Sequence, residues 1–292
     1  MLYDIKLTIS YDYERLADTG RHLLRLQPLN IEGEQRVVSS FLSVDPSPVE
    51  RTDRVDFFGN SVVEIAYGDA HPDMRCSVRA RVDRIQMPTT FDISTPVDRI
   101  SDEAASVASL AHDAPCHFLG SSPRIALDPA MAAYGRDHVT AGMSTMEAVC
   151  AIGTALYNDM EFDPAATTAD TPAAEAFARK RGVCQDFTHI MISCLRGISV
   201  PAGYVSGFLR TLPPEDGPRL EGADAMHAWV RAWCGLEFGW LEFDPTNALI
   251  VGSDHIVVAR GRDYADVNPV NGAMRTSGDQ TSHQAVDVIP LH

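Results

Sequence analysis

The sequence lacks several features that would assign it to a broad class of protein. No apolar run reaches the roughly 18 residues of a membrane-spanning helix, and the stretch from Met1 to Lys6 does not have the shape of a signal peptide. Basic residues are few, since 24 Lys and Arg stand against 40 Asp and Glu and give a formal net charge of −16. Such a chain has no basic excess with which to displace counterions from a phosphate backbone. We therefore expect a cytoplasmic protein whose partners include neither nucleic acid nor a membrane.

The six cysteines form no CxxC pair and no regular framework. They stand at positions 76, 116, 150, 184, 194 and 234, and a cytosolic chain would keep them reduced. Cys150 and Cys194 fall on the apolar stripes of predicted helices, where a free cysteine commonly behaves as a small buried hydrophobe. Cys184 differs from these two because further motifs accompany it along the chain.

Cys184 is predicted to lie in the first turn of a buried helix. The apolar residues at 187, 190, 191, 194, 195 and 198 have the spacing of a core-facing helical stripe. Cys184 precedes Phe187 by three residues and so shares its face. Unpaired N–H groups and the positive end of the helix dipole favour an anion there, in this case a thiolate. Asp186 is expected to satisfy the helix end, and Gly197 to stop the helix.

His227 and Asp244 are predicted to lie on neighbouring strands. Residues 227–234 and 237–244 read as two strands around Gly235-Leu236, which suits a type II′ turn. That turn would place His227 directly opposite Asp244, within reach of a hydrogen bond. A register slipped by one would send the two side chains to opposite faces, and a slip by two would leave them on one face but offset. The chain thus offers a thiol nucleophile, its base and the base's orienter.

These motifs together resemble the bacterial transglutaminase-like superfamily, a papain-like group of cysteine hydrolases and transferases. The resemblance covers about residues 100 to 270, and residues 1 to about 95 resemble the β-rich N-terminal region that often precedes this core. It implies a helix that carries the cysteine, packed on an antiparallel sheet that carries the histidine and the aspartate. The motifs are Gly182-Val183-Cys184-Gln185-Asp186-Phe187, Arg196-Gly197-Ile198, Tyr204-Val205-Ser206-Gly207, His227-Ala228-Trp229-Val230 and Gly239-Trp240-Leu241-Glu242-Phe243-Asp244-Pro245-Thr246-Asn247.

The predicted fold class is α+β, and 292 residues are enough for two domains. Residues 1–95 are predicted to form a β-rich N-terminal domain, with strands at 3–11, 37–44, 61–66 and 76–85. Residues 96–270 are predicted to form the papain-like transglutaminase core. Its helix starts are indicated by Asp128-Pro129, by Thr171-Pro172 and by the capping box of Ser144 and Glu147. Residues 271–292 are expected to be a polar linker that ends in a candidate strand at 285–289.

The resemblance and the three residues predict a cysteine hydrolase that acts on peptide or amide bonds through a thioester, without cofactor or metal. A transamidase is the alternative, because both reactions share every residue up to the acyl-enzyme, and so is a noncatalytic peptide-binding module on the same fold. A zinc hydrolase built from His189, His227, His255 and Cys184 lacks the spacing of a known zinc motif. The expected partner is a peptide or protein substrate, and the oligomeric state stays open.

Further residues are expected to support the site. The backbone N–H of Cys184 is expected to donate to the oxyanion, while no second donor is identified. His189 lies about 140° around the helix from Cys184, which favours a structural role. The polar, turn-rich residues 211–225 are expected to form a specificity loop or lid. The candidates for oxyanion, supporting or wall positions are Gln185, Asp186, His189, Trp229 and Trp240, the two tryptophans as walls.

Overall fold

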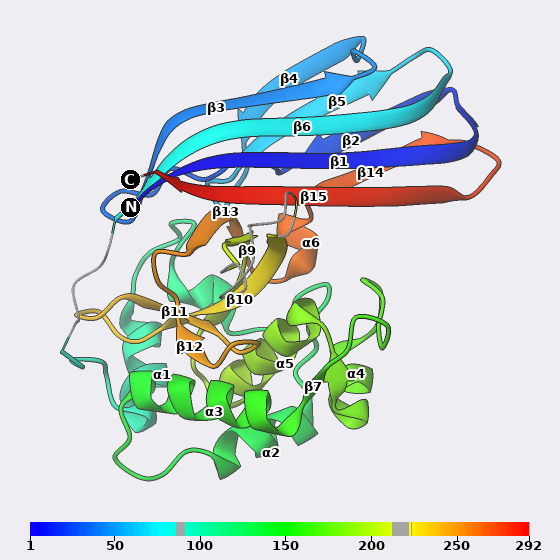
Figure 1. The fold of residues 1–292 in the computed structure, drawn as a ribbon. Coiled ribbons are helices and arrows are strands. Elements are labelled where there is room, and N and C mark those ends of the chain that lie inside the picture. The colour runs from blue at the N-terminus through cyan, green and yellow to red at the C-terminus, as the bar shows by residue number, and fades with distance from the viewer. Residues whose placement is uncertain (86–90, 212–221, 223, 292) are drawn as a thin grey trace, which may run out of the picture.

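The computed structural model describes residues 1–85, 91–211, 222 and 224–291, and it confirms the α+β class. A β-sandwich lies above a core of helices and sheet, and the two chain termini lie side by side (Figure 1). Within the described residues, no helix is long and apolar enough to cross a membrane.

The sandwich consists of two four-stranded antiparallel sheets, with strand orders β15-β1-β6-β3 and β14-β2-β5-β4. Alternate residues of β1, from Tyr3 to Ile9, are buried in the interior, as the period of two predicts. Neither β2 nor β4 was expected from the sequence. β4 is exposed along its whole length, so its side chains show no alternation of buried and exposed positions. The strands are β1 (Leu2–Ala17), β2 (Thr19–Leu24), β3 (Gln35–Asp45), β4 (Glu50–Val55), β5 (Ser61–Tyr67), β6 (His71–Arg84), β14 (Val270–Arg275) and β15 (Gln280–Leu291).

The C-terminal residues form strands where a polar linker was expected. β14 pairs with β2, and β15 pairs with β1 from Leu2 opposite Leu291 to Tyr13 opposite Gln280. The polar composition of 271–282 misled the prediction, because these residues lie at exposed sheet edges, where a strand needs few apolar side chains. The chain therefore returns from the core to complete both sheets of the sandwich.

The core packs its helices around α5, which lies against a five-stranded sheet of order β12-β11-β10-β9-β13. Asp128 and Ser144 cap α2 and α3 as predicted, the latter in a complete capping box with Glu147. The helices are α1 (Val97–Ser106), the 3-10 helix η1 (Pro115–Phe118), α2 (Pro129–Asp137), α3 (Thr145–Asp159), α4 (Ala173–Arg179), α5 (Cys184–Gly197) and α6 (Tyr264–Val267). The strands are β7 (Glu161–Phe162), β8 (Arg181–Gly182), β9 (Ala202–Leu209), β10 (Ala225–Trp233), β11 (Trp240–Asp244), β12 (Leu249–Ile250) and β13 (His255–Gly261).

The register between β10 and β11 differs by two residues from the predicted one. Val230 lies opposite Phe243 and Trp233 opposite Trp240, and residues 234–239 form a loop instead of a two-residue turn. Gly235 and Gly239 both adopt positive φ, and the N–H of Cys234 donates to the carbonyl of Gly239. These contacts close a loop that is longer than the predicted two-residue type II′ turn. His227 and Asp244 are consequently offset on one face instead of directly opposed.

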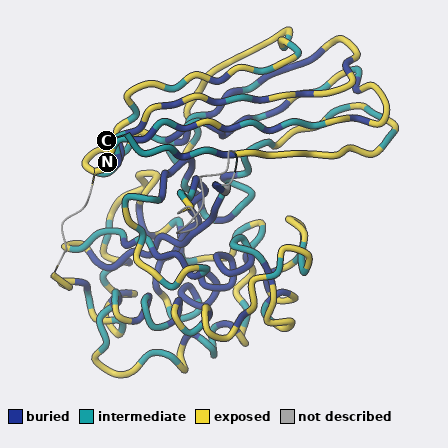
Figure 2. Tube along the Cα trace, viewed as in Figure 1, coloured by how far each residue is buried: buried dark blue, intermediate teal, exposed yellow. Residues whose placement is uncertain are grey.

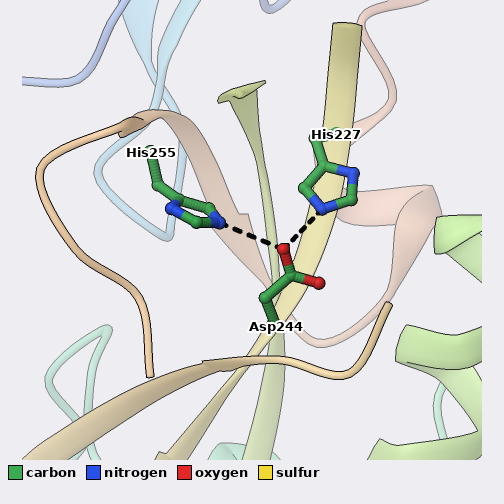
Figure 3. Close-up of side chains that lie close together, drawn as sticks. All are labelled: His227, Asp244 and His255. Atoms are coloured by element: carbon green, nitrogen blue, oxygen red, sulfur yellow. Dashed lines mark hydrogen bonds and ion pairs between the residues drawn. The ribbon is translucent and has the colours of Figure 1, made fainter. Parts of the chain in front are cut away.

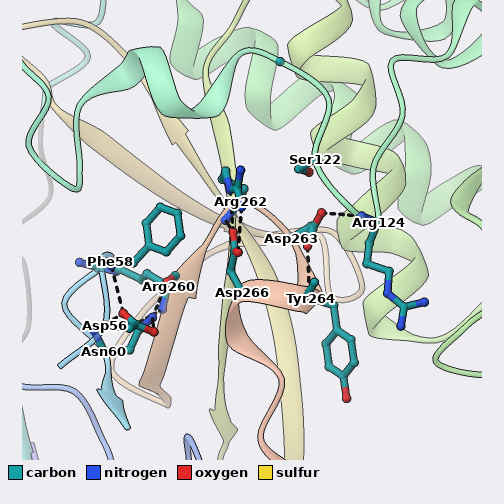
Figure 4. Close-up of polar contacts among 12 residues, drawn as sticks. Asp56, Phe58, Asn60, Ser122, Arg124, Arg260, Arg262, Asp263, Tyr264 and Asp266 are labelled. Atoms are coloured by element: carbon teal, nitrogen blue, oxygen red, sulfur yellow. Dashed lines mark hydrogen bonds and ion pairs between the residues drawn. The ribbon is translucent and has the colours of Figure 1, made fainter. Parts of the chain in front are cut away.

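Two buried amides join the sandwich to the core sheet. Gln35 accepts from the N–H of Val257 and donates to its carbonyl, and Asn60 does the same for Arg260 (Figure 4). Each amide thus supplies β13, an edge strand of the core sheet, with the partners that another strand would provide. Phe208 of β9 packs with the sandwich interior. The interface is buried between the two parts (Figure 2), which fixes the sandwich above the core.

Candidate active site

Cys184 begins α5, as predicted, and lines a cavity of about 640 Å³. Asp186 satisfies the helix end, because its carboxylate accepts the N–H of Val183 at 2.8 Å and the hydroxyl of Thr167 at 2.5 Å. Burial raises the pKa of Asp186, although these two hydrogen bonds act in the opposite direction. Gln185 donates to the carbonyl of Ala169 at 3.0 Å. Both side chains therefore fasten the preceding loop over the N-terminal end of α5.

His227 and Asp244 meet despite the shifted register. The Nε2 atom of His227 lies 2.7 Å from Oδ2 of Asp244, and both residues are buried. Asp244 also accepts the side-chain amide of Asn247 and the backbone N–H groups of Thr246 and Asn247. The carboxylate therefore starts the turn after β11 and orients the imidazole at the same time, and Nδ1 of His227 is left available for another partner.

His255 is a second imidazole on the same carboxylate, which the sequence did not predict. Its Nε2 atom lies 3.1 Å from Oδ2 of Asp244, so that the two histidines flank the aspartate from β10 and β13 (Figure 3). The potential metal-ligand atoms of the three residues lie within 4.8 Å of one another, and the two hydrogen bonds account for this closeness. Only a tertiary contact signals the role of His255, because β13 is distant from β11 in the sheet order.

The environment of His227 and Asp244 stabilises the charged forms of both side chains. Burial disfavours the charged ring of His227, but its hydrogen bonds with Asp244 and Cys184 outweigh burial and raise its pKa to about 10. Burial alone would raise the pKa of Asp244, yet the hydrogen bonds from His227 and His255 hold it well below its usual range. At neutral pH, an imidazolium therefore lies between a carboxylate and the Cys184 sulfur.

His189 belongs to the framework of the core, as its place on the helix predicted. Its Nε2 atom accepts the N–H of Tyr264 at 3.2 Å, and its ring lies 5.2 Å from that of Tyr204. Burial lowers the pKa of His189 to about 4, which keeps the ring neutral. It does not join His227 and His255, so the four ligands of the zinc alternative are not brought together.

The two candidate wall tryptophans differ in position. The ring of Trp229 lies 6.2 Å from that of His227 and 5.1 Å from that of His255, and its Nε1 donates to Glu242 at 2.8 Å. Trp229 therefore packs beside both imidazoles. Trp240 instead lies under the guanidinium of Arg231, at 4.1 Å, outside the lining of the Cys184 cavity. The lining of the Cys184 cavity includes neither tryptophan, so the expectation that they wall it is wrong for both. Trp240 lies four residues along β11 from Asp244, and Trp229 packs behind the imidazoles.

The sandwich supplies part of the cavity wall, and the sequence did not indicate this. Ile9 and Tyr11 of β1 line the cavity together with residues 282–284 of β15. Residues 282–284 were missed because their segment was expected to be a linker. Ile9 and Tyr11 lie in a predicted strand, but their place at the cavity depends on how the sandwich packs on the core. In the predicted specificity loop, residues 212–221 and 223 lie outside the described part of the chain.

Comparison with known proteins identifies the family. A model described as the transglutaminase-like superfamily matches residues 132–245, and one described as the bacterial transglutaminase-like N-terminal region matches residues 3–83. An uncharacterized protein of Mycobacterium tuberculosis is 33% identical over 261 residues, which cover 88% of this chain and 83% of that protein. An uncharacterized protein of Mycobacterium leprae is 28% identical over 286 residues and 96% of each chain. The chain belongs to the transglutaminase-like superfamily.

One solved structure shares the whole fold. A protein from Cytophaga hutchinsonii, provisionally described as a cysteine protease, superposes with a TM-score of 0.76 over 100% of this chain and 91% of its own. The two sequences are 23% identical, so the likeness concerns the fold. It extends over the sandwich as well as the core.

Proposed function

We propose that this protein is a cysteine hydrolase that cleaves peptide or amide bonds in a peptide or protein substrate. The proposal is carried by one observation, the hydrogen bond of 2.7 Å between His227 and Asp244 beside a cysteine that begins a buried helix. Membership of the transglutaminase-like superfamily supports the same class of chemistry.

In the first half of the reaction, the Cys184 thiolate attacks the carbonyl carbon and forms a carbon–sulfur bond. The developing oxyanion accepts a hydrogen bond from the N–H of Cys184, which has no acceptor within the helix. The carbon–nitrogen bond then breaks, and the His227 imidazolium gives its Nδ1 proton to the leaving amine. Asp244 holds the ring in the orientation that this transfer requires. A thioester and a neutral imidazole result.

In the second half, water resolves the thioester. Neutral His227 takes one proton from the attacking water, and the carbon–sulfur bond breaks. The carboxylic acid leaves, and the thiolate and imidazolium are restored. A primary amine in place of water would give transamidation through the same intermediate.

The test measures the rate of alkylation by iodoacetamide from pH 5 to 9. Wild-type protein is expected to react quickly at Cys184 even at acidic pH, and His227→Ala to react at least about tenfold more slowly. Peptide mapping locates the label, Cys184→Ala is the blank, and the exposed Cys116 is an internal reference thiol. If Cys184 reacts no faster than Cys116 at acidic pH in the folded protein, the hydrolase proposal fails, and a binding module on the same fold becomes the better reading.

Product masses distinguish the two fates of the thioester. With a glutamine-containing peptide and excess primary amine, a hydrolase yields the free acid or a cleaved peptide. Predominant formation of the amine adduct would assign the chain to the transamidases instead.

A further inference from the structure

The edge of β15 runs along the cavity that contains Cys184. β15 is the outermost strand of its sheet, and residues 280–285 are exposed (Figure 2). Ser282, His283 and Gln284 all line the cavity. Because successive side chains of a strand point to opposite faces, three consecutive residues reach one cavity only when it lies along the strand's edge.

The register shows which backbone groups of β15 point to this open edge. Val286 accepts the N–H of Asp224, and the N–H of Val288 donates to the Asp224 carboxylate, so both residues direct their backbone groups away from β1. The pairing with β1 has no bulge. By the alternation of an antiparallel ladder, Gln284 and Ser282 also direct their N–H and C=O groups outward. No described residue pairs with these groups.

The bridge between Asp224 and Val286 marks where β10 and β15 touch. Beyond it, Met226 and His227 on one side and residues 282–284 on the other side line the same cavity. The open edge therefore faces the strand that carries the candidate base.

Elsewhere this protein covers comparable edges. The amides of Gln35 and Asn60 occupy the outward groups of β13. Exposed edges are usually blunted by charge, proline or a bulge, but residues 280–285 read Gln-Thr-Ser-His-Gln-Ala and contain no Lys, Arg, acid or proline. An unblunted edge that no described residue covers, beside a nucleophile, is suited to receive a chain with its own amide groups.

We propose that an extended peptide segment of the substrate adds as a strand to the edge of β15, where the backbone of Ser282 and Gln284 holds it beside Cys184. The inference rests on the proposed function and names its substrate class as unfolded or extended polypeptide. Recognition through backbone groups gives affinity with little demand on side chains. The sandwich then acts as the substrate-binding half of the site.

The test uses acetyl-tetra-alanyl chloromethyl ketone, whose side chains are minimal. The Cys184 thiolate displaces chloride from this probe and forms a thioether, which intact mass detects. The measured quantity is the ratio of the probe's rate constant to that of iodoacetamide, which cancels changes in thiol reactivity. Gln284→Pro removes an outward N–H without breaking the ladder with β1. It is expected to lower the ratio about fivefold to tenfold more than Gln284→Ala does.

Two controls separate this effect from misfolding. Gln280→Pro makes the same backbone change at an outward position that does not line the cavity, and it is expected to leave the ratio unchanged. On the wild-type protein, N-methylation of the probe's backbone nitrogens removes the donors that would pair with β15. The rate ratio measured with this probe is expected to fall by a similar factor, without any change to the protein.

The outcomes are distinguishable. Equal ratios for Gln284→Pro and Gln284→Ala, or an N-methylated probe as fast as its parent, would overturn the edge proposal while leaving the hydrolase intact. A change from dimer to monomer in Gln284→Pro with an unaltered ratio would assign the edge to a second copy of the chain, which also overturns it. If Cys184 fails the iodoacetamide test, the proposed function itself has failed.

Discussion

At the residue scale, Asp244 is the most heavily bonded group of the candidate site. It accepts hydrogen bonds from two imidazoles, one side-chain amide and two backbone N–H groups while fully buried. A buried charge is tolerated only when it is compensated in this way. Its environment therefore contributes to folding and to orienting His227.

Asp244→Ala is expected to lower the free energy of unfolding by about 3–5 kcal/mol, because both imidazoles lose their partner. The depressed pKa of Asp244 means that its contribution is complete above the unfolded value of about 4 and is lost as the pH falls below it. The difference in unfolding free energy between wild type and variant, measured by urea denaturation, should thus shrink on acidification. A difference that stays constant down to pH 3 would contradict the assignment.

The contribution of His227 to stability is expected to have the opposite pH dependence, with its loss on the alkaline side. Its pKa is raised to about 10, so its stabilising contribution is complete below about 6.5 and is lost as the pH rises through 10. Wild-type stability should decline over this window, and His227→Gln should flatten the decline. Parallel curves for the two proteins in urea between pH 6.5 and 10 would refute this expectation.

His255 is expected to be a positioning residue for the base. His255→Leu removes one donor from Asp244 and should slow alkylation of Cys184 at pH 6 about threefold to tenfold. His255→Gln, which can restore a donor, should recover part of the rate. A changed pH profile of alkylation, with melting temperature as control, distinguishes this role from simple loss of stability.

At the element scale, close packing of β9, β10 and β13 places His227. Gly207 lies directly opposite His227, and a Cβ there would overlap the Trp229 ring and the Ile256 carbonyl. Gly207→Ala is therefore expected to cost about 1–3 kcal/mol through overpacking and to slow Cys184 alkylation. Gly252→Ala, whose Cβ meets nothing within 4 Å, is the matched control for denaturation and labelling. Equal stability of the two variants would count against this packing argument.

Among the helices and strands, the sequence predicted local features but not the register of one strand pair. The apolar stripe of α5 and the capping boundaries of α2 and α3 are local patterns, and the structure confirms them. The β10–β11 register was wrong by two residues because it depends on how residues 234–239 close the loop against Thr95. Side-chain alternation survives a slip of two, so His227 and Asp244 still share a face.

At the scale of the whole molecule, the buried amides of Gln35 and Asn60 decide how the sandwich sits on the core. Asn60→Leu leaves the N–H and C=O of Arg260 without partners, which is expected to cost about 2–5 kcal/mol of unfolding free energy. Asn30→Ala, which removes an exposed hydrogen bond to Val37, should cost less than about 1 kcal/mol. Chemical denaturation of both variants checks the difference, and similar costs would disprove the role of the interface amide.

The sequence by itself determined the family, through the motifs around Cys184, His227 and Asp244 that resemble it. It also determined the α+β class, because helical periodicity, capping and strand alternation act over a few residues. Tertiary structure alone decided that His255 joins Asp244, that residues 270–291 return to the sandwich and that β15 borders the cavity. These features depend on contacts between segments far apart in the chain. Local patterning carries no information about which distant edge or carboxylate a polar residue will meet.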